Sequence, residues 1–129
     1  MKKICLLSCL LMISLVHVTA QTNNKMKEKL LRHVVLFSFK EGSTDAQIKA
    51  VTDAFAALPQ KISQVKSFEW GTNNSPENLN QGFTHCFYVG FASEADRALY
   101  LQHTEHLAIV ELLKSVVDKV LRIAYWASE

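Results

Sequence analysis

Three residues whose side chains can move protons are spaced three apart near the end of the sequence: Tyr100, His103 and His106. Residues three apart share a face wherever the backbone is helical. A neutral imidazole beside a phenol in an apolar pocket suits proton transfer near neutral pH, because burial lowers the pKa of a histidine and leaves a free base. This cluster is therefore the first candidate site.

The same residues also allow structural interpretations. A buried histidine at a helix break often caps a helix or bonds loose backbone groups, and this applies above all to His103. Two histidines three apart can also share a zinc ion if a third ligand lies near. Glu105 points away from the face of His103 and His106, and no other acidic residue has suitable spacing. We therefore expect no metal site.

The elements that must position this cluster follow from hydrophobic spacing and helix caps. Thr44 and Gln47 form a capping-box pattern, and apolar residues including Phe55 then recur at helical spacing until Pro59, which we expect to end the helix. Ser93 marks a second helix start. The predicted order is a strand, a helix, two strands, a helix that breaks near 103–104 and a strand, over residues 31–39, 44–59, 65–71, 83–91, 93–117 and 120–126. This is the ferredoxin-like βαββαβ order of an α+β fold with an antiparallel sheet.

The first and third predicted strands, 31–39 and 83–91, are apolar on both faces. We expect both strands to be buried on both faces, and the third to be central in the sheet. Helices in this topology cover only one face, so a second copy of the chain is expected to cover the other and to form a homodimer through the sheet face. Cys86 points toward that face and is interpreted as a packing residue.

The first twenty residues are typical of a cleavable signal peptide. Lys2 and Lys3 precede an apolar stretch over 4–16, and Val18 and Ala20 occupy the two positions where signal peptidase needs small or unbulky residues. The stretch is shorter than the roughly 18 apolar residues of a membrane-spanning helix. We expect cleavage after Ala20, export to the periplasm or the outside of a bacterial cell, and no membrane anchor.

Removal of residues 1–20 changes the charge and the cysteine content. Of the 14 lysines and arginines, Lys2 and Lys3 would be lost, and the remaining 12 match the 12 acidic residues. A neutral domain does not favour nucleic acid as a partner. One of the 3 cysteines would remain, which excludes an internal disulfide. We expect a polar disordered arm over 21–30 and one domain over 31–127.

Four segments carry a resemblance to a known family. They are RHVVLFSFK at 32–40, GFTH at 82–85, FAS at 91–93 and YLQHTEH at 100–106. The chain resembles the stress-responsive A/B barrel (Dabb) family, whose members have a ferredoxin-like fold and pair their sheets into a dimeric α/β barrel. The family pattern has His-Pro-x-His where this chain has His103-Thr104-Glu105-His106, so Thr104 replaces a proline.

The resemblance implies a reaction as well as a fold. Some plant members of the family look like lyases that close a polyketide chain into an aromatic ring by aldol condensation and loss of carboxylate. By that resemblance His106 removes a proton alpha to a carbonyl, while Tyr100 holds the carbonyl oxygen, with no metal or organic cofactor.

The resemblance also implies a pocket between the sheet and the helices, lined by His33, His85, His103 and Phe55. His33 and His85 can equally be core histidines. The leading hypothesis is an exported protein that binds a small apolar or aromatic organic molecule. The alternatives are a cofactor-free lyase or cyclase, a cofactor-free monooxygenase and a non-enzymatic stress-response or structural barrel. Export would place the protein away from acyl-carrier chemistry, which weighs against a polyketide cyclase.

Overall fold

The computed structural model describes residues 29–128, so the expected leader and most of the expected arm lie outside the described residues. The strands and helices follow one another in the predicted order. Their bounds are β1 (Leu31–Phe39), α1 (Asp45–Ala56), α2 (Leu58–Lys61), β2 (Ser67–Thr72), β3 (His85–Phe91), α3 (Glu94–Gln102), α4 (Thr104–Val116) and β4 (Val117–Trp126).

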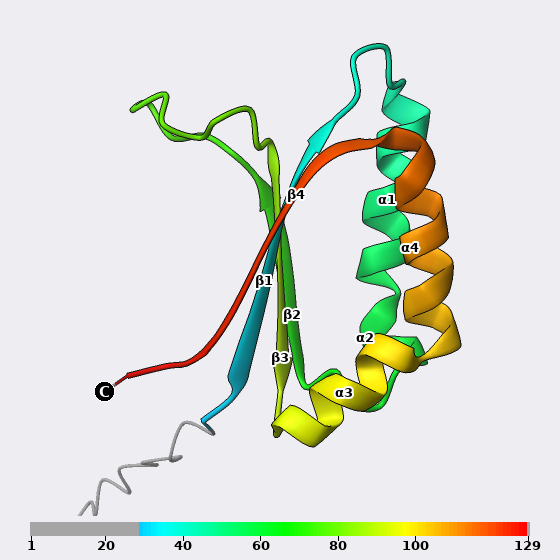
Figure 1. The fold of residues 1–129 in the computed structure, drawn as a ribbon, viewed down its shortest axis with the longest axis vertical. Helices are drawn as coiled ribbons and strands as arrows, with labels where there is room; N and C mark the ends of the chain where they lie inside the picture. Colours follow the sequence, from blue (N-terminus) through cyan, green and yellow to red (C-terminus); the bar gives the residue numbers. More distant parts are fainter. Residues whose placement is uncertain (1–28, 129) are drawn as a thin grey trace, which may run out of the picture.

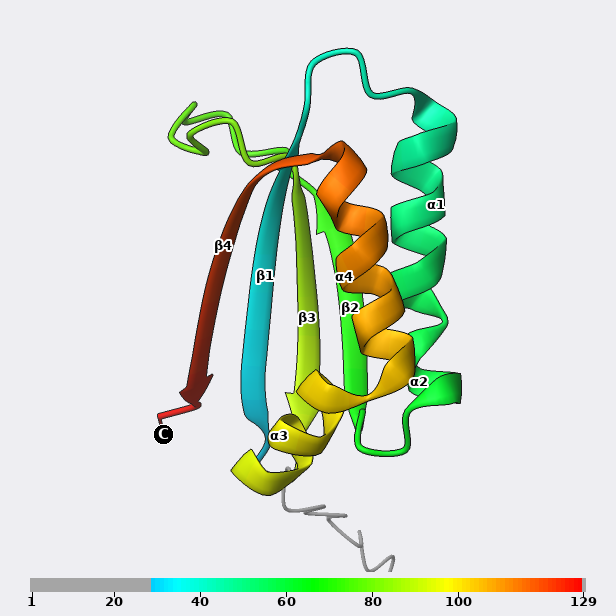
Figure 2. The same cartoon turned by 45° about the vertical axis from the view of Figure 1, so that its right-hand side comes forward.

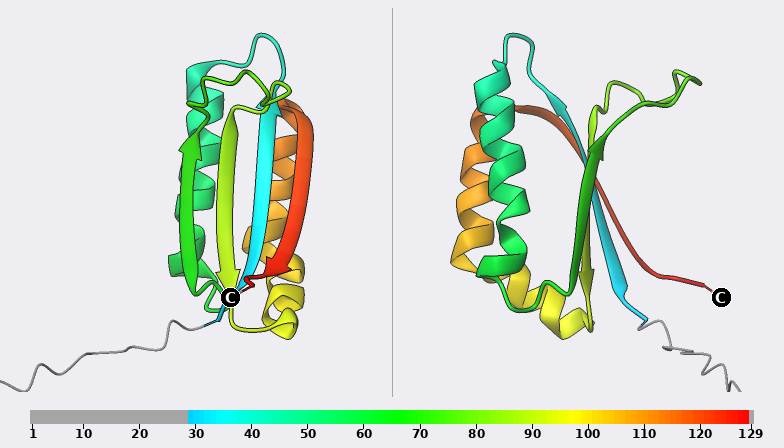
Figure 3. Two further views of the ribbon diagram at one scale, coloured as in Figure 1. Left: turned by 90° about the vertical axis from the view of Figure 1, so that its left-hand side faces the viewer. Right: turned by 180° about the vertical axis from the view of Figure 1, so that it is seen from behind.

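The strands form one antiparallel sheet in the order β2-β3-β1-β4. The central strands are β1 and β3 (Figure 2), and the central place of β3 was predicted from its two apolar faces. The helices lie against one face of the sheet (Figure 1), and no other element of the described chain covers the opposite face (Figure 3). The prediction of a ferredoxin-like α+β fold is therefore confirmed.

The helix starts have the local causes that the sequence indicated. The Thr44 side chain accepts a hydrogen bond from the Gln47 backbone N–H, and the Gln47 side chain accepts one from the Thr44 N–H, which completes a capping box. The Ser93 hydroxyl accepts from the Asp96 N–H at the start of α3. Each cap satisfies an N–H that has no partner inside its helix.

Pro59 does not end the first helix, contrary to the prediction. Helix α1 stops at Ala56, and Pro59 lies in the first turn of the short helix α2. Proline is tolerated there because a first-turn N–H has no helical acceptor to lose. The last strand also starts earlier than predicted, since α4 passes into β4 at Val117 without a connecting loop.

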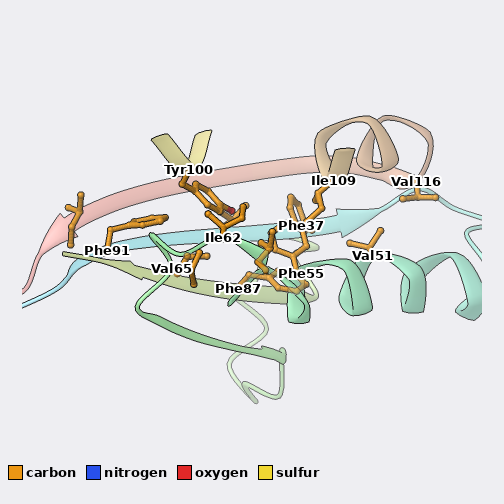
Figure 4. Packing of buried hydrophobic residues seen from close by; sticks show 14 residues of the cluster. Phe37, Val51, Phe55, Ile62, Val65, Phe87, Phe91, Tyr100, Ile109 and Val116 are labelled. Carbon is orange, nitrogen blue, oxygen red and sulfur yellow. The ribbon is translucent and has the colours of Figure 1, made fainter. Parts of the chain in front are cut away.

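The core lies between the sheet and the helices (Figure 4). Phe37 of β1, Phe55 of α1 and Phe87 of β3 meet at its centre, and their ring centroids are 4.4 to 5.6 Å apart. Phe91 and Tyr100 extend this aromatic layer toward α3, with centroids 4.9 Å apart. Full burial of rings of this size contributes about 1.5–3 kcal/mol for each side chain.

The outer face of the sheet is apolar too, but it is open. Antiparallel register places Val34 opposite Ile123 and Leu36 opposite Leu121 on this face. Ile123 is 51% exposed and Leu121 45% exposed. Cys86 also points to this side and is exposed, as its alternation with His85 predicted.

Among residues 29–128, no helix has the length and the apolar character needed to cross a membrane.

Candidate functional site

A cavity of about 240 Å³ lies between the sheet and the helices, beside β4. Its walls come from β1, β4, α1, α3 and α4. They consist of apolar side chains with a few polar groups: His33, Val35, Phe37, Phe55, Tyr100, Leu101, His106, Ile109, Val110, Leu113, Lys114, Val117, Asp118, Val120 and Arg122.

The sheet side of the cavity is built by the pairing of β1 with β4. Val35 lies opposite Arg122, and Phe37 lies opposite Val120. Residues directly opposite in an antiparallel pair point to the same face. Because β-strand side chains alternate, His33 joins Val35 on the helix-covered face. His33 is 8% exposed.

The helical wall of the cavity is shaped by the break between α3 and α4. His103 has the extended torsions φ −67° and ψ 139°, so the chain leaves α3 and re-enters a helix at Thr104. This turn brings Tyr100 of α3 against His106 of α4, with ring centroids 4.5 Å apart. The His33 ring approaches the Tyr100 ring edge-on at 6.3 Å. Three predicted residues thus meet at one end of the cavity, although Tyr100 and His106 do not share one helix.

The hydrogen bond of His106 assigns its neutral tautomer. Its Nδ1 lies 3.1 Å from the carbonyl oxygen of Leu101. A carbonyl oxygen only accepts hydrogen bonds, so Nδ1 carries the hydrogen and donates it. The neutral ring therefore keeps a free lone pair on Nε2.

Burial keeps His106 neutral and Tyr100 protonated. Burial lowers the pKa of His106, and the charge of Arg122 acts in the same direction, while the bond to the Leu101 carbonyl opposes both. Burial raises the pKa of Tyr100. At neutral pH the pair is therefore a free imidazole base beside a phenol that still holds its proton.

The pKa of His33 is lowered more strongly than that of His106. Burial lowers the pKa of His33 to about 4, and the charge of Arg97 is the next largest cause. A group with this pKa is a neutral hydrogen-bonding residue at physiological pH rather than an ion. His33 therefore contributes a polar wall to the cavity.

Two predicted binding residues lie away from the cavity. The Nδ1 of His103 accepts a hydrogen bond from the Glu105 N–H at 3.2 Å, so its ring caps α4. His85 stacks on Trp70, with centroids 6.3 Å apart, and its Nδ1 contacts the Thr84 hydroxyl. Neither His103 nor His85 is among the residues that line this cavity, so their predicted part in binding stays a prediction.

Phe55 lines the cavity from the core side of α1, and its part in ligand binding stays a prediction. Within residues 29–128, no group of three or more histidine, cysteine, aspartate or glutamate side chains is placed to hold a metal ion.

The sequence reasoning missed the charged residues of the cavity wall, which are Lys114, Asp118 and Arg122. A signal for Arg122 was present in the alternation of the last strand. Val120, Ala124 and Trp126 share its face, so Arg122 is the charged exception on an inward-facing row.

Comparison with known proteins agrees with this architecture. The sequence model described as "Stress responsive A/B Barrel Domain" matches residues 31–127. The stress-response A/B barrel domain-containing protein HS1 of Arabidopsis thaliana is 38% identical over 95 residues, which cover 74% of this chain and 87% of that protein. Olivetolic acid cyclase of Cannabis sativa is 26% identical over 95 residues, which cover 74% of this chain and 94% of the cyclase.

A similar solved structure comes from Bacteroides fragilis and is described as a dimeric protein of unknown function with a ferredoxin-like fold. It is 25% identical, with a TM-score of 0.62, and the match covers 76% of this chain and 96% of that one. The fold, the family model and the Arabidopsis relative agree, and this chain therefore belongs to the stress responsive A/B barrel domain family.

Proposed function

We propose that the protein binds a small apolar or aromatic organic molecule in the cavity beside β4. The observation that carries this proposal is a cavity of about 240 Å³ with apolar walls, at one end of which His33, Tyr100 and His106 converge. Apolar pockets with a few convergent polar groups are the usual form of small-molecule sites. The volume is below the range of about 300–1,000 Å³ for drug-sized ligands, which favours a ligand with one ring.

Thermal shift with a panel of one-ring aromatic compounds tests binding. We expect some of them to raise the melting temperature of the natural protein, and His106→Ala to reduce these shifts because His106 forms part of the wall. His103→Ala is the matched control, since it removes a histidine that lies outside the wall. Equal shifts in the natural protein and His106→Ala would remove His106 from the site.

A second candidate function is proton transfer alpha to a carbonyl, as in a cofactor-free lyase or cyclase. It is favoured by the free Nε2 of His106 and by the protonated Tyr100 beside it. In this mechanism Nε2 takes the proton, while the Tyr100 hydroxyl donates a hydrogen bond to the carbonyl oxygen, where negative charge develops. The similarity to olivetolic acid cyclase supports the reaction class.

Deuterium exchange tests this chemistry without knowledge of the natural substrate. A one-ring aryl ketone incubated in D₂O with the protein should lose its alpha proton signal faster than in buffer. His106→Ala should abolish the acceleration, Tyr100→Phe should reduce it about 10²-fold, and His103→Ala should leave it unchanged. Equal exchange with and without protein would contradict the catalytic role.

The protein is also proposed to work as a homodimer through the outer face of the sheet. This face carries exposed Leu121, Ile123 and Tyr125, and the similar Bacteroides protein is dimeric. Packing a second sheet against them removes a large apolar surface from water. Sedimentation at micromolar concentration should give twice the mass of one chain.

Export remains a proposal, supported by the charged start, the apolar stretch and the small residues before Gln21. Intact mass of protein recovered from a bacterial periplasm should correspond to a chain that begins at Gln21. A full-length mass in the cytoplasmic fraction would contradict both the cleavage and the export.

A further inference from the structure

Arg122 is a charged residue in the wall of the cavity. It lies on β4 opposite Val35, so its side chain points to the helix-covered face and forms part of the cavity wall. Its neighbours on that face of β4 are Val120 and Ala124. Arg122 is itself exposed, because β4 is the edge strand of the sheet, so it forms a solvent-facing part of the cavity wall.

The charges around the cavity are not balanced. Lys114 forms an ion pair with Glu111, and Asp118 accepts a hydrogen bond from the Ser38 hydroxyl. Arg122 takes part in none of the ion pairs found within residues 29–128. Among the charged residues of the wall, Arg122 is therefore the cation that has no ion-pair partner in the described part of the chain. The N–H groups of its guanidinium can donate hydrogen bonds to a ligand.

Arg122 also acts on the polar end of the cavity. Burial is the main cause of the lowered pKa of His33 and of His106, and the positive charge of Arg122 lowers both further, although for His33 the charges of Arg97 and His106 contribute more. His33, His106 and Arg122 also line the same cavity. A bound anion would therefore meet the guanidinium while the rest of the ligand reaches toward the two rings.

We propose that the natural ligand is a small organic carboxylate, whose carboxylate is bound by the guanidinium of Arg122 and whose apolar body fills the cavity. This inference rests on the proposed binding function and adds the chemical class of the ligand. Guanidinium and carboxylate match in a planar pair with two parallel hydrogen bonds, which is stronger than neutral hydrogen bonding. Arg122 is the one arginine among the residues described as lining this cavity, which fits one carboxylate at the wall, and Leu113 and Ile109 of the lining are available to an apolar body.

Two compounds of the same shape and different charge test the inference. Isothermal titration compares 4-butylbenzoate with the neutral 4-butylbenzamide on the natural protein, Arg122→Gln and Lys66→Gln. Lys66 is exposed beside β2, at the sheet edge away from β4, and its loss changes the net charge by the same amount. It is therefore a matched control for long-range charge effects.

We expect the natural protein and Lys66→Gln to bind the benzoate about tenfold more tightly than the benzamide, and Arg122→Gln to bind both equally. An unchanged benzamide affinity in Arg122→Gln shows that the cavity is intact. A preference for benzoate that survives in Arg122→Gln, or equal binding by the natural protein, overturns the role of Arg122 while the proposed binding function stands. Binding of neither compound by the natural protein counts against both proposals.

Discussion

The two faces of the sheet carry similar side chains in different surroundings. On the helix-covered face, Phe37 and Phe87 are 1% and 0% exposed in a packed aromatic core. On the outer face, Ile123 is 51% exposed and Tyr125 44% exposed. Hydrophobicity in the sequence does not distinguish the two faces, because the residues of both faces are apolar and would be predicted to be buried.

The helix-covered face of the sheet is less closely packed at the edge strand β4 than at its centre. The helices cover β1 and β3 closely, while Val120 on the inner row of β4 remains 40% exposed. The cavity lies at this margin. Apolar residues of one sheet thus lie in three settings: a packed core at the centre, the proposed ligand cavity beside β4 and the proposed dimer interface on the outer face.

Truncation at the centre of the core should have the largest effect. Phe87→Ala removes a fully buried ring that contacts Phe37 and Phe55, so the free energy of unfolding should fall by about 3–5 kcal/mol. Leu79→Ala is the control, because Leu79 is 74% exposed, and its change should stay within about 0.5 kcal/mol. Chemical denaturation measures both, and similar losses in the two variants would contradict the assignment of the core.

Acid should destabilise the inner face through His33. The pKa of His33 is lowered to about 4 in the folded protein, below the ordinary value of 6.5, so the unfolded chain takes up the proton first. The stability that depends on neutral His33 is complete above pH 6.5 and is lost as the pH falls from 6.5 to 4, by about 3 kcal/mol in total.

Urea denaturation at several pH values measures this loss, with His33→Phe as the comparison. His85 and His106 also have lowered pKa values and remain in both proteins, so the difference between the two curves isolates His33. Parallel curves would show that His33 is not held neutral by its burial.

A charge on the outer face should separate the subunits and leave the fold intact. Ile123→Glu would place a carboxylate against the partner's apolar sheet, and we expect the dimer dissociation constant to rise about 100-fold, or about 2.7 kcal/mol. Leu99→Glu makes the same kind of change on exposed α3 and should leave the dimer unaffected. Sedimentation reads out mass, and circular dichroism checks the fold; a dimeric Ile123→Glu would place the interface elsewhere.

Much of the fold was predictable because local signals agreed with one another. The capping box at Thr44 and the two-faced strand over 31–39 are recorded in neighbouring residues, and both are present in the structure. The start of β4 was not predictable to the residue. Val117 continues directly from α4, so no glycine, proline or polar turn marks the change.

The site was predictable only in part. Tyr100 and His106 were singled out by spacing, but their contact depends on the backbone turn at His103 and not on a shared helical face. Arg122 was missed because its place in the cavity comes from pairing with Val35, which is 87 positions away in sequence and is visible only in the sheet register. Long-range pairing of this kind leaves only an alternation signal in the strand itself.

Substitution of His103 should have the smallest effect on stability. It also tests whether this side chain caps a helix or binds a ligand. Its Nδ1 accepts from the Glu105 N–H, so His103→Ala should lower the free energy of unfolding by about 1 kcal/mol, the ordinary loss of a helix cap. His103→Asn should restore most of this, because asparagine is a good cap. Ligand binding should match the natural protein in both variants. A large loss of affinity in the asparagine variant, with stability retained, would instead make His103 part of the binding site.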